Sequence, residues 1–455
     1  MRAAALVLGL VLAAPTAGWA ETPEEEPKAP EDEPEAPEDE PEAPENEPAP
    51  DGSPDGEPPP ADPAEKKTEV SVLPGAAYDS NLGFGFGVIG DIARFHPDYD
   101  PFKARVSAQL FLYLGPNPSG GVRVTFQHHY LRLDLPGLAN DRLRLRATIR
   151  YRQQINVGYY GIGNATSDTK PWQDIDREAE PERWAEARRY NEYGMIRPEL
   201  NVEALARISG PVFAYGALRV WWTWPNITEG TKLAEDLASP DENLTRFLVG
   251  AERHGVVEAT AGLVYDTRDN EIAPNRGMFH ELGVRGGPTI EQAGGYGGLH
   301  LQARFYGSLL GDWIVVAGRV MADGLFGQPP FQELARFSGQ WPDFGPGGAT
   351  SVRGVPLQRY HGKVKLMGNL ELRTKLIRFN FFKRPLSAGL IGFFDTGRVW
   401  ADWRREPTLD GEALGLAVGV GGGLRIQWGG TFVVRADVGW SPDGLGVYFD
   451  VNHIF

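Results

Sequence analysis

The sequence predicts an all-β protein, a sixteen-stranded antiparallel transmembrane β-barrel. Apolar and polar residues alternate along many short segments, and the connections between these segments alternate between short and long. Composition supports the same fold class, because the 455-residue chain has 57 Gly, 12 Trp, 15 Tyr and 22 Phe. After the N-terminus, no apolar run is long enough for a membrane-spanning helix.

The first twenty residues, MRAAALVLGLVLAAPTAGWA, predict a secretory signal peptide over residues 1–20. Arg2 provides the charged start, residues 3–14 the apolar middle, and Gly18 to Ala20 a small-residue cleavage site. The apolar run is too short for a membrane anchor. The chain has no cysteine, which excludes disulfides, thiolate metal sites and a lipid-modified cysteine.

Residues 21–65 are expected to form a disordered acidic tail. Residues 21–64 contain 18 Asp or Glu, one Lys and 14 Pro, which gives a charge of −17 against −16 for the whole chain. The remainder is therefore close to neutral. Such a segment cannot bury a core and should be extended. Its role is left open between a spacer or solubilising arm and a docking arm or tether.

The alternation that predicts a barrel over residues 66–455 is clearest in DRLRLRATIRYR, residues 141–152. Leu143 and Ile149 lie on one face of this strand, and Arg144 and Arg146 on the other. A soluble β-sandwich rarely carries so many arginines in file on its polar face. In a membrane barrel they face a wet lumen and pair with acids of neighbouring strands. We expect these arginines to form ion pairs inside the lumen rather than to line a pore.

Sixteen candidate strands follow residue 66. They lie near residues 69–78, 84–95, 102–114, 121–133, 141–157, 189–208, 211–223, 255–267, 277–286, 297–309, 312–323, 363–378, 386–400, 413–428, 431–441 and 445–455. The long connections fall near residues 159–188, 224–254 and 325–362. An even strand number puts both barrel ends in the periplasm and the long loops outside. Aromatic residues near strand ends, such as Tyr159, Trp221 and Trp440, predict interface belts.

The last strand is predicted to reach the final residue, with Phe449, Val451 and Phe455 on one outward face. An alternating terminal strand that ends on an aromatic resembles the signal by which barrel-assembly machinery selects its clients. Pairing with an open edge of that machinery would use β-augmentation. The machinery is therefore an expected partner during biogenesis.

Four motifs follow one another along the second half of the chain. They are SVRGV (351–355), GNLELR (368–373), FFDTG (393–397) and AVGVGGGLRIQW (417–428). Together they resemble the bacterial surface antigen family, the sixteen-stranded barrels related to BamA and TamA, over about residues 66–455.

The resemblance implies that the longest outer loop folds back into the lumen. Arg353 would there meet Asp395, with Glu371 as a second candidate partner. A planar guanidinium suits such a site because it binds carboxylates through two parallel hydrogen bonds. Gly354 and Gly397 lack a Cβ and would leave room for the loop to approach the wall.

The resemblance also implies a role in inserting or translocating protein or lipid at the outer membrane, through a weak seam between the first and last strands. The alternative is a passive channel or surface-structural barrel. Assembly members of the family carry periplasmic POTRA domains, and the acidic tail is too short to form one, so this chain resembles a member without them. Outer-membrane lipid and client proteins or lipids are the expected partners, and the tail is expected in the periplasm.

An enzyme is not expected from this sequence. It contains no GxSxG motif, and we find no catalytic triad, zinc-ligand spacing or phosphate-binding loop. No metal, no cofactor and no nucleic acid is therefore expected.

Overall fold

A computed structural model describes residues 68–96, 102–292, 294–340, 342–381, 384–428 and 432–455. The predicted signal peptide and acidic tail lie outside these residues. Over the described chain, seventeen strands form one antiparallel sheet. The strands are β1 (Thr68–Asp79), β2 (Gly83–Arg94), β3 (Ala104–Pro116), β4 (Val122–Gly137), β5 (Leu143–Gly158), β6 (Glu192–Ser209), β7 (Val212–Asn226), β8 (His254–Asp266), β9 (Gly277–Ile290), β10 (Gly295–Leu309), β11 (Ile314–Gly327), β14 (Val364–Thr374), β15 (Ile377–Phe381), β16 (Arg384–Trp400), β17 (Ala417–Trp428), β18 (Phe432–Ser441) and β19 (Gly444–Val451).

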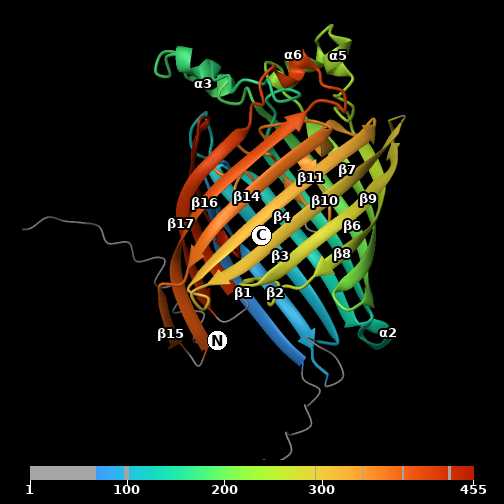
Figure 1. The fold of residues 1–455 in the computed structure, drawn as a ribbon. Helices are drawn as coiled ribbons and strands as arrows, with labels where there is room; N and C mark the ends of the chain where they lie inside the picture. Colours follow the sequence, from blue (N-terminus) through green and yellow to red (C-terminus); the bar gives the residue numbers. More distant parts are fainter. Residues whose placement is uncertain (1–67, 97–101, 293, 341, 382–383, 429–431) are drawn as a thin grey trace, which may run out of the picture. The chain divides into compact units, whose positions relative to one another are not determined.

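Apart from β14 and β15, each strand of the sheet pairs with the next one along the chain, and β19 pairs with β1, so the sheet closes into a barrel (Figure 1). β14 and β15 both pair with β16. These two strands are therefore successive parts of one position in the wall, and the seventeen strands make a sixteen-stranded barrel. The predicted fold class is confirmed.

Side chains alternate between the outer surface and the lumen. On β9, Leu282 and Val284 are 58% and 52% exposed on the outer surface, whereas Glu281 and Arg285 are 2% and 4% exposed and line the lumen. Lipid accepts the apolar outer face, and the charged inner face finds its partners across the lumen. Within the described residues, no helix combines the length and apolar character needed to cross a membrane.

The long connections gather at one end of the barrel and the described chain ends lie toward the other. They follow β5, β7, β11 and β16, and three of them carry the short helices α3 (Pro181–Ala187), α4 (Lys232–Leu237), α5 (Glu242–Thr245) and α6 (Pro407–Asp410). Figure 1 shows α3, α5 and α6 together at one end, and α2 (Leu138–Asp141) and β15 at the opposite end. This arrangement follows from antiparallel strands joined by alternately short and long connections.

The closing contact between β1 and β19 is short. The two strands pair at two positions, Tyr78↔Phe449 and Asp79↔Tyr448. On their other sides, β1 pairs with β2 at twelve positions and β19 with β18 at eight. One further backbone hydrogen bond joins Ser80 N to Val447 O at 3.0 Å. Over the described residues, the rest of β1 is paired only with β2.

The last strand differs from the prediction. It ends at Val451, and Asn452 turns the chain with a φ of 67°. Ile454 and Phe455 are 9% and 5% exposed and pack inside the barrel. Phe455 therefore does not share the outward face with Val451, which is 39% exposed. Arginines of the wall hold the turned segment, as described below, and sequence alternation carries no information about such contacts.

The predicted aromatic belts are correct only in part. Trp440 is 57% exposed on the outer surface. Tyr159 and Trp221, in contrast, are 0% and 1% exposed. They belong to an apolar cluster with Phe331 and Leu334 of the loop after β11. These two aromatics therefore pack in a core formed by the wall and its loops and do not contact the membrane interface.

Candidate functional site

The loop between β11 and β14, residues 328–363, folds back into the lumen. It contains the short 3₁₀ helix η2 (Phe331–Ala335) and the two-stranded ribbon of β12 (Arg336–Phe337) and β13 (Asp343–Phe344). All five residues of η2 are buried. Further along the loop, Val352 and Arg353 are both 0% exposed. The loop tip is thus enclosed by the wall.

Arg353 at the loop tip contacts carboxylates from three strands. Its Nε and Nη2 donate hydrogen bonds to Asp395 on β16 at 2.7 and 3.0 Å, and its backbone N–H donates to the same carboxylate at 3.1 Å. Its Nη1 donates to Glu371 on β14 at 2.8 Å and to Asp437 on β18 at 3.2 Å. The structure therefore brings together Arg353, Asp395 and Glu371, the residues singled out from the sequence.

Burial and charge act in opposite directions on Arg353. Burial alone would lower the pKa of its guanidinium, but Asp395 and Glu371 outweigh this effect and raise the pKa above its usual range. The guanidinium carbon also lies 3.4 Å from the centre of the Phe393 ring. Arg353 is therefore a permanently charged group whose contacts are satisfied inside the protein.

Glycines allow this close approach. Gly354 has a φ of +92°, and its N–H donates to the Tyr448 hydroxyl of β19 at 3.1 Å. A Cβ on Gly397 would lie 2.8 Å from Pro346 of the loop, and one on Gly419 of β17 would lie 2.1 Å from the Arg353 carbonyl oxygen. A larger residue at these positions would push the loop tip away from the wall.

Residues 256–452 match the Omp85 superfamily domain. The resemblance to BamA-like outer-membrane barrels that the motifs indicate is therefore confirmed. Among curated proteins, no sequence matches the chain significantly.

Solved structures share the fold of this barrel. BamA from Haemophilus ducreyi lacking POTRA domains 1–3 is 12% identical, with a TM-score of 0.52, over 85% of this chain and 70% of that one. CdiB from Escherichia coli is also 12% identical, with a TM-score of 0.50, over 85% of this chain and 67% of that one. At this identity the likeness concerns the fold.

Sequence reasoning missed Asp437, the third carboxylate that contacts Arg353. Asp437 also accepts hydrogen bonds from Arg425, at 3.1 Å to Nη2, and from Arg435, at 3.3 Å to Nη1. A usable signal was present in the sequence. Arg425 and Arg435 are directly opposite on β17 and β18, and two like charges in such a pair require a nearby acid.

A second anchor of the loop was also missed. Glu333 of η2 is 0% exposed and accepts hydrogen bonds from Arg197 at 3.3 Å, Arg285 at 3.1 Å and Arg336 at 2.6 Å. Arg285 also binds Asp323 of β11 through both carboxylate oxygens, at 3.0 and 3.1 Å. The loop is thus held at two points, by Glu333 near its start and by Arg353 near its middle.

The C-terminal residues Phe449, Val451 and Phe455, predicted as an assembly signal, are divided between two environments. Phe449 and Val451 lie on β19, whereas Phe455 is buried in the lumen. Arg373 Nη2 donates to the Phe455 backbone oxygen at 3.0 Å, and Arg319 Nη1 donates to the Ile454 carbonyl at 3.3 Å. Arg373 also binds Glu371 at 2.8 Å, so one carboxylate connects the C-terminus to Arg353.

These groups are arranged for fastening rather than for chemistry. Each carboxylate around Arg353 is ion-paired with it. Within the described ranges, no group of three or more His, Asp or Glu side chains is placed to hold a metal ion.

Proposed function

We propose that this Omp85 barrel assists the insertion or translocation of protein or lipid at the outer membrane, and that its wall opens between β1 and β19. The supporting observation is the pairing of these strands at two positions, Tyr78↔Phe449 and Asp79↔Tyr448. The same strands pair with β2 and β18 at twelve and eight positions. Backbone hydrogen bonds are the main cohesion between neighbouring strands in lipid, so the wall is weakest at this seam.

An opened seam would present strand edges within the membrane. Over the described residues, Thr68 to Ala77 of β1 have partners in β2 but none in β19. Unpaired N–H and C=O groups are unfavourable in lipid, and an incoming strand satisfies them by adding to the edge. This chemistry favours a client with its own unpaired strand, such as an outer-membrane barrel that is still folding.

The position of the loop at residues 328–363 favours this proposal over a passive channel. The loop lies in the lumen and is held by the contacts of Arg353 and Glu333. A passive open pore would require these contacts to break. We assign to Arg353, with Gly354, Gly397, Glu371 and Asp395, the role of fastening the loop while the seam moves.

The proposed orientation puts the described chain ends and the acidic tail in the periplasm and the long loops outside the cell. Clients would reach the seam from the periplasm, and the barrel-assembly machinery would insert this chain itself. Phe449 and Val451 remain the proposed contacts of that machinery, with Phe455 joining the lumen after folding.

The test compares two disulfide locks that share one cysteine, which is simple because the chain has none. Tyr78 is paired with Phe449 across the seam and with Phe84 inside the β1–β2 hairpin. Tyr78→Cys combined with Phe449→Cys locks the seam, and Tyr78→Cys combined with Phe84→Cys is the matched control.

Each variant is reconstituted in vesicles to measure two rates, the insertion of a urea-unfolded outer-membrane barrel and the movement of a fluorescent lipid between leaflets. The proposal expects one of these rates to rise with the reduced protein and to fall to the level of empty vesicles when the seam lock is oxidised. The control lock should leave the rate unchanged. Equal rates for the two oxidised variants, or no acceleration by the reduced protein, would refute the proposal.

A further inference from the structure

The lumen contains a cavity of about 410 Å³ whose lining is rich in arginine. Strands β4 to β7 form its wall, and Arg336, Gln340, Pro342 and Phe344 of the lumenal loop cover it. Seven arginines and two glutamates line it, which leaves five excess positive charges in the lining. Cavities lined by one sign of charge within a low-dielectric wall concentrate the electric field and attract counter-ions.

Five of these arginines are neutralised by carboxylates of the protein. The pairs are Arg146–Glu203 at 3.0 Å, Arg150–Glu199 at 2.9 Å, Arg197–Glu333 at 3.3 Å, Arg219–Glu258 at 3.2 Å and Arg336–Glu333 at 2.6 Å. Two of these five, Arg146 and Arg150, belong to the arginine file on β5, as expected for pairing. The other two arginines of the lining form no such pair.

Arg132 and Arg152 have no carboxylate partner among the described residues. Arg132 Nε donates to the Thr148 hydroxyl at 3.3 Å. The Arg152 guanidinium carbon lies 4.1 Å from the centre of the Phe344 ring and 5.3 Å from that of Phe126. Its Nε is buried without a hydrogen-bond partner in the described protein. Ring contacts alone do not satisfy the donors of a guanidinium.

The position of Arg152 adds a repulsive contact. Arg152 and Arg197 are directly opposite on β5 and β6, and both line the cavity. Like charges directly opposite on one face of an antiparallel pair are destabilising. Glu333 neutralises Arg197 but is shared with Arg285 and Arg336, so the repulsion on Arg152 is incompletely compensated. An anion beside Arg152 would remove it.

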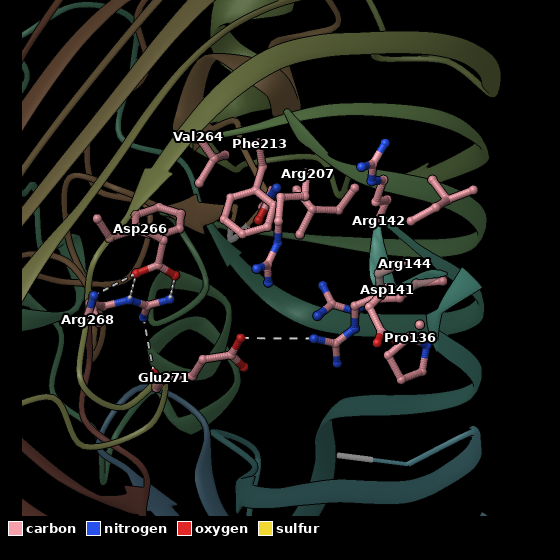
Figure 2. Close-up of a pocket in the computed structure, with 16 residues that line it drawn as sticks. Pro136, Asp141, Arg142, Arg144, Arg207, Phe213, Val264, Asp266, Arg268 and Glu271 are labelled. Carbon is pink, nitrogen blue, oxygen red and sulfur yellow. Dashed lines mark hydrogen bonds and ion pairs between the residues drawn. The ribbon is translucent and has the colours of Figure 1, made fainter. Parts of the chain in front are cut away.

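A second cavity of about 210 Å³ lies beside the first and shares Arg146 and Gln340 with it. Figure 2 shows this cavity, with Arg144 and Glu271 in contact across it and Arg268 held by Asp266. Its lining includes Arg142, next to α2, and Glu271, in the β8–β9 turn. Both belong to the end of the barrel opposite the long loops, so the second cavity extends toward that end.

We propose that the inner cavity binds a small phosphorylated molecule, with Arg152 as the charged contact of its phosphate group and Arg132, four residues away along the wall, as a second charged contact. A phosphate monoester carries close to two negative charges near neutral pH, which suits the unpaired guanidinium of Arg152 in a lining with excess positive charge. Arginine presents planar, paired donors that suit phosphate oxygens. The volume far exceeds the roughly 30 Å³ of a water molecule in the liquid, so a small group attached to the phosphate also fits. The site does not depend on opening of the seam.

The test uses the purified full chain in nanodiscs at constant ionic strength, with sodium chloride as the reference salt. Isothermal titration calorimetry measures binding of inorganic phosphate, glycerol 3-phosphate and lysophosphatidic acid. Binding of the two soluble probes would point to a free metabolite, and binding of the lipid alone to a headgroup; either supports a phosphate site. Absence of binding for all three probes would overturn the proposal.

Arg152→Gln should weaken binding roughly tenfold or more, since it removes a charge-assisted contact. It should also raise the unfolding temperature of the ligand-free protein, because the repulsion from Arg197 is removed. If Arg152 had a purely structural role, Arg152→Gln would lower the unfolding temperature instead. Arg132→Gln is the second variant, in case Arg152→Gln fails to fold.

The matched control is Arg304→Gln on β10. The Arg304 guanidinium carbon lies 5.3 Å from the centre of the Phe279 ring, and Arg304 has no carboxylate partner in the part of the chain that the structure describes. It lines neither cavity, so its replacement should leave phosphate affinity unchanged. Equal affinities in Arg304→Gln, Arg152→Gln and Arg132→Gln would show that the cavity is not the binding site.

Discussion

Asp395 accepts three hydrogen bonds from Arg353, from its backbone N–H at 3.1 Å, its Nε at 2.7 Å and its Nη2 at 3.0 Å. Both side chains are fully buried. The backbone contact means that Asp395 fixes the position of the loop as well as the charge of the side chain. This one relationship joins the long loop to a strand of the wall.

The Arg353–Asp395 contact should matter most when one partner is removed. Arg353→Ala and Asp395→Ala should each lower the free energy of unfolding by about 3–5 kcal/mol, because the remaining charge is left buried. Arg353→Ala should have the larger effect, since it also affects Glu371 and Asp437. Urea unfolding in lipid, followed by tryptophan fluorescence, measures the difference.

The double variant Arg353→Ala/Asp395→Ala should lose less free energy of unfolding than the two single variants lose together, because the two residues are coupled. Arg183→Ala, which removes a surface ion pair with Glu180 at 2.9 Å, should leave the midpoint unchanged. Additive losses of free energy of unfolding would show that Arg353 and Asp395 do not hold the loop through a shared contact.

Gly419→Ala should displace the loop tip, because the new Cβ would lie 2.1 Å from the Arg353 carbonyl oxygen. Overpacking of this kind lowers stability by about 1–3 kcal/mol. Gly392→Ala on β16 is the control, because no heavy atom lies within 4 Å of its Cβ position. Proteolysis in detergent should cut the loop at residues 328–363 faster in Gly419→Ala than in the control. Identical cleavage rates would contradict the close approach.

His361 near the end of the same loop should make stability depend on pH. Burial, with added repulsion from Lys365 and Arg359, lowers its pKa from 6.5 to about 3. The native state therefore keeps His361 neutral, while the unfolded chain takes up a proton below about pH 6.5. Stability from this group is fully present above pH 6.5 and falls by about 1.4 kcal/mol per unit as the pH drops toward 3.

Unfolding midpoints between pH 7.5 and 4.5 measure this effect, and His361→Phe should flatten the pH dependence. The Phe ring would keep the contacts with Tyr159 and Phe331, whose rings lie 5.2 and 6.4 Å from that of His361. The same pH dependence in both proteins would show that His361 is not responsible.

Labelling of single cysteines on intact cells tests the proposed orientation. A membrane-impermeant maleimide should react with Ala179→Cys and Ala238→Cys, in the loops after β5 and β7, and not with Ser209→Cys at the opposite end. Ser351→Cys should react only after denaturation, because Ser351 is 0% exposed in the lumen. Reaction confined to Ser209→Cys would reverse the orientation.

Local patterns were enough to predict the wall. Period-two alternation, as along residues 141–152, and loop lengths determine strand number and which faces meet lipid. The Arg353–Asp395–Glu371 arrangement came from ordered motifs rather than from alternation. What escaped prediction depends on contacts between distant residues. Asp437 meets Arg353, Glu333 meets Arg197, and Arg373 holds the segment that turns inward at Asn452, and each of these arginines lies far away in the sequence.

The aromatic residues show the same limit. Trp221 and Trp440 both lie near strand ends, yet one is 1% exposed under the folded loops and the other is 57% exposed. Position along a strand does not reveal which residues a loop will cover. Only the packing of η2 against the wall distinguishes the two.

The most direct test of a wall that opens between β1 and β19 is amide hydrogen exchange in nanodiscs, measured with and without the two disulfide locks. Peptides from residues 68–79 and 444–451 should exchange faster than peptides from β5 and β6, which pair at fourteen positions. Oxidising Tyr78→Cys with Phe449→Cys should slow exchange at the seam, and oxidising Tyr78→Cys with Phe84→Cys should not. Seam peptides that are as protected as β5 and β6, or that do not respond to the seam lock, would contradict an opening seam.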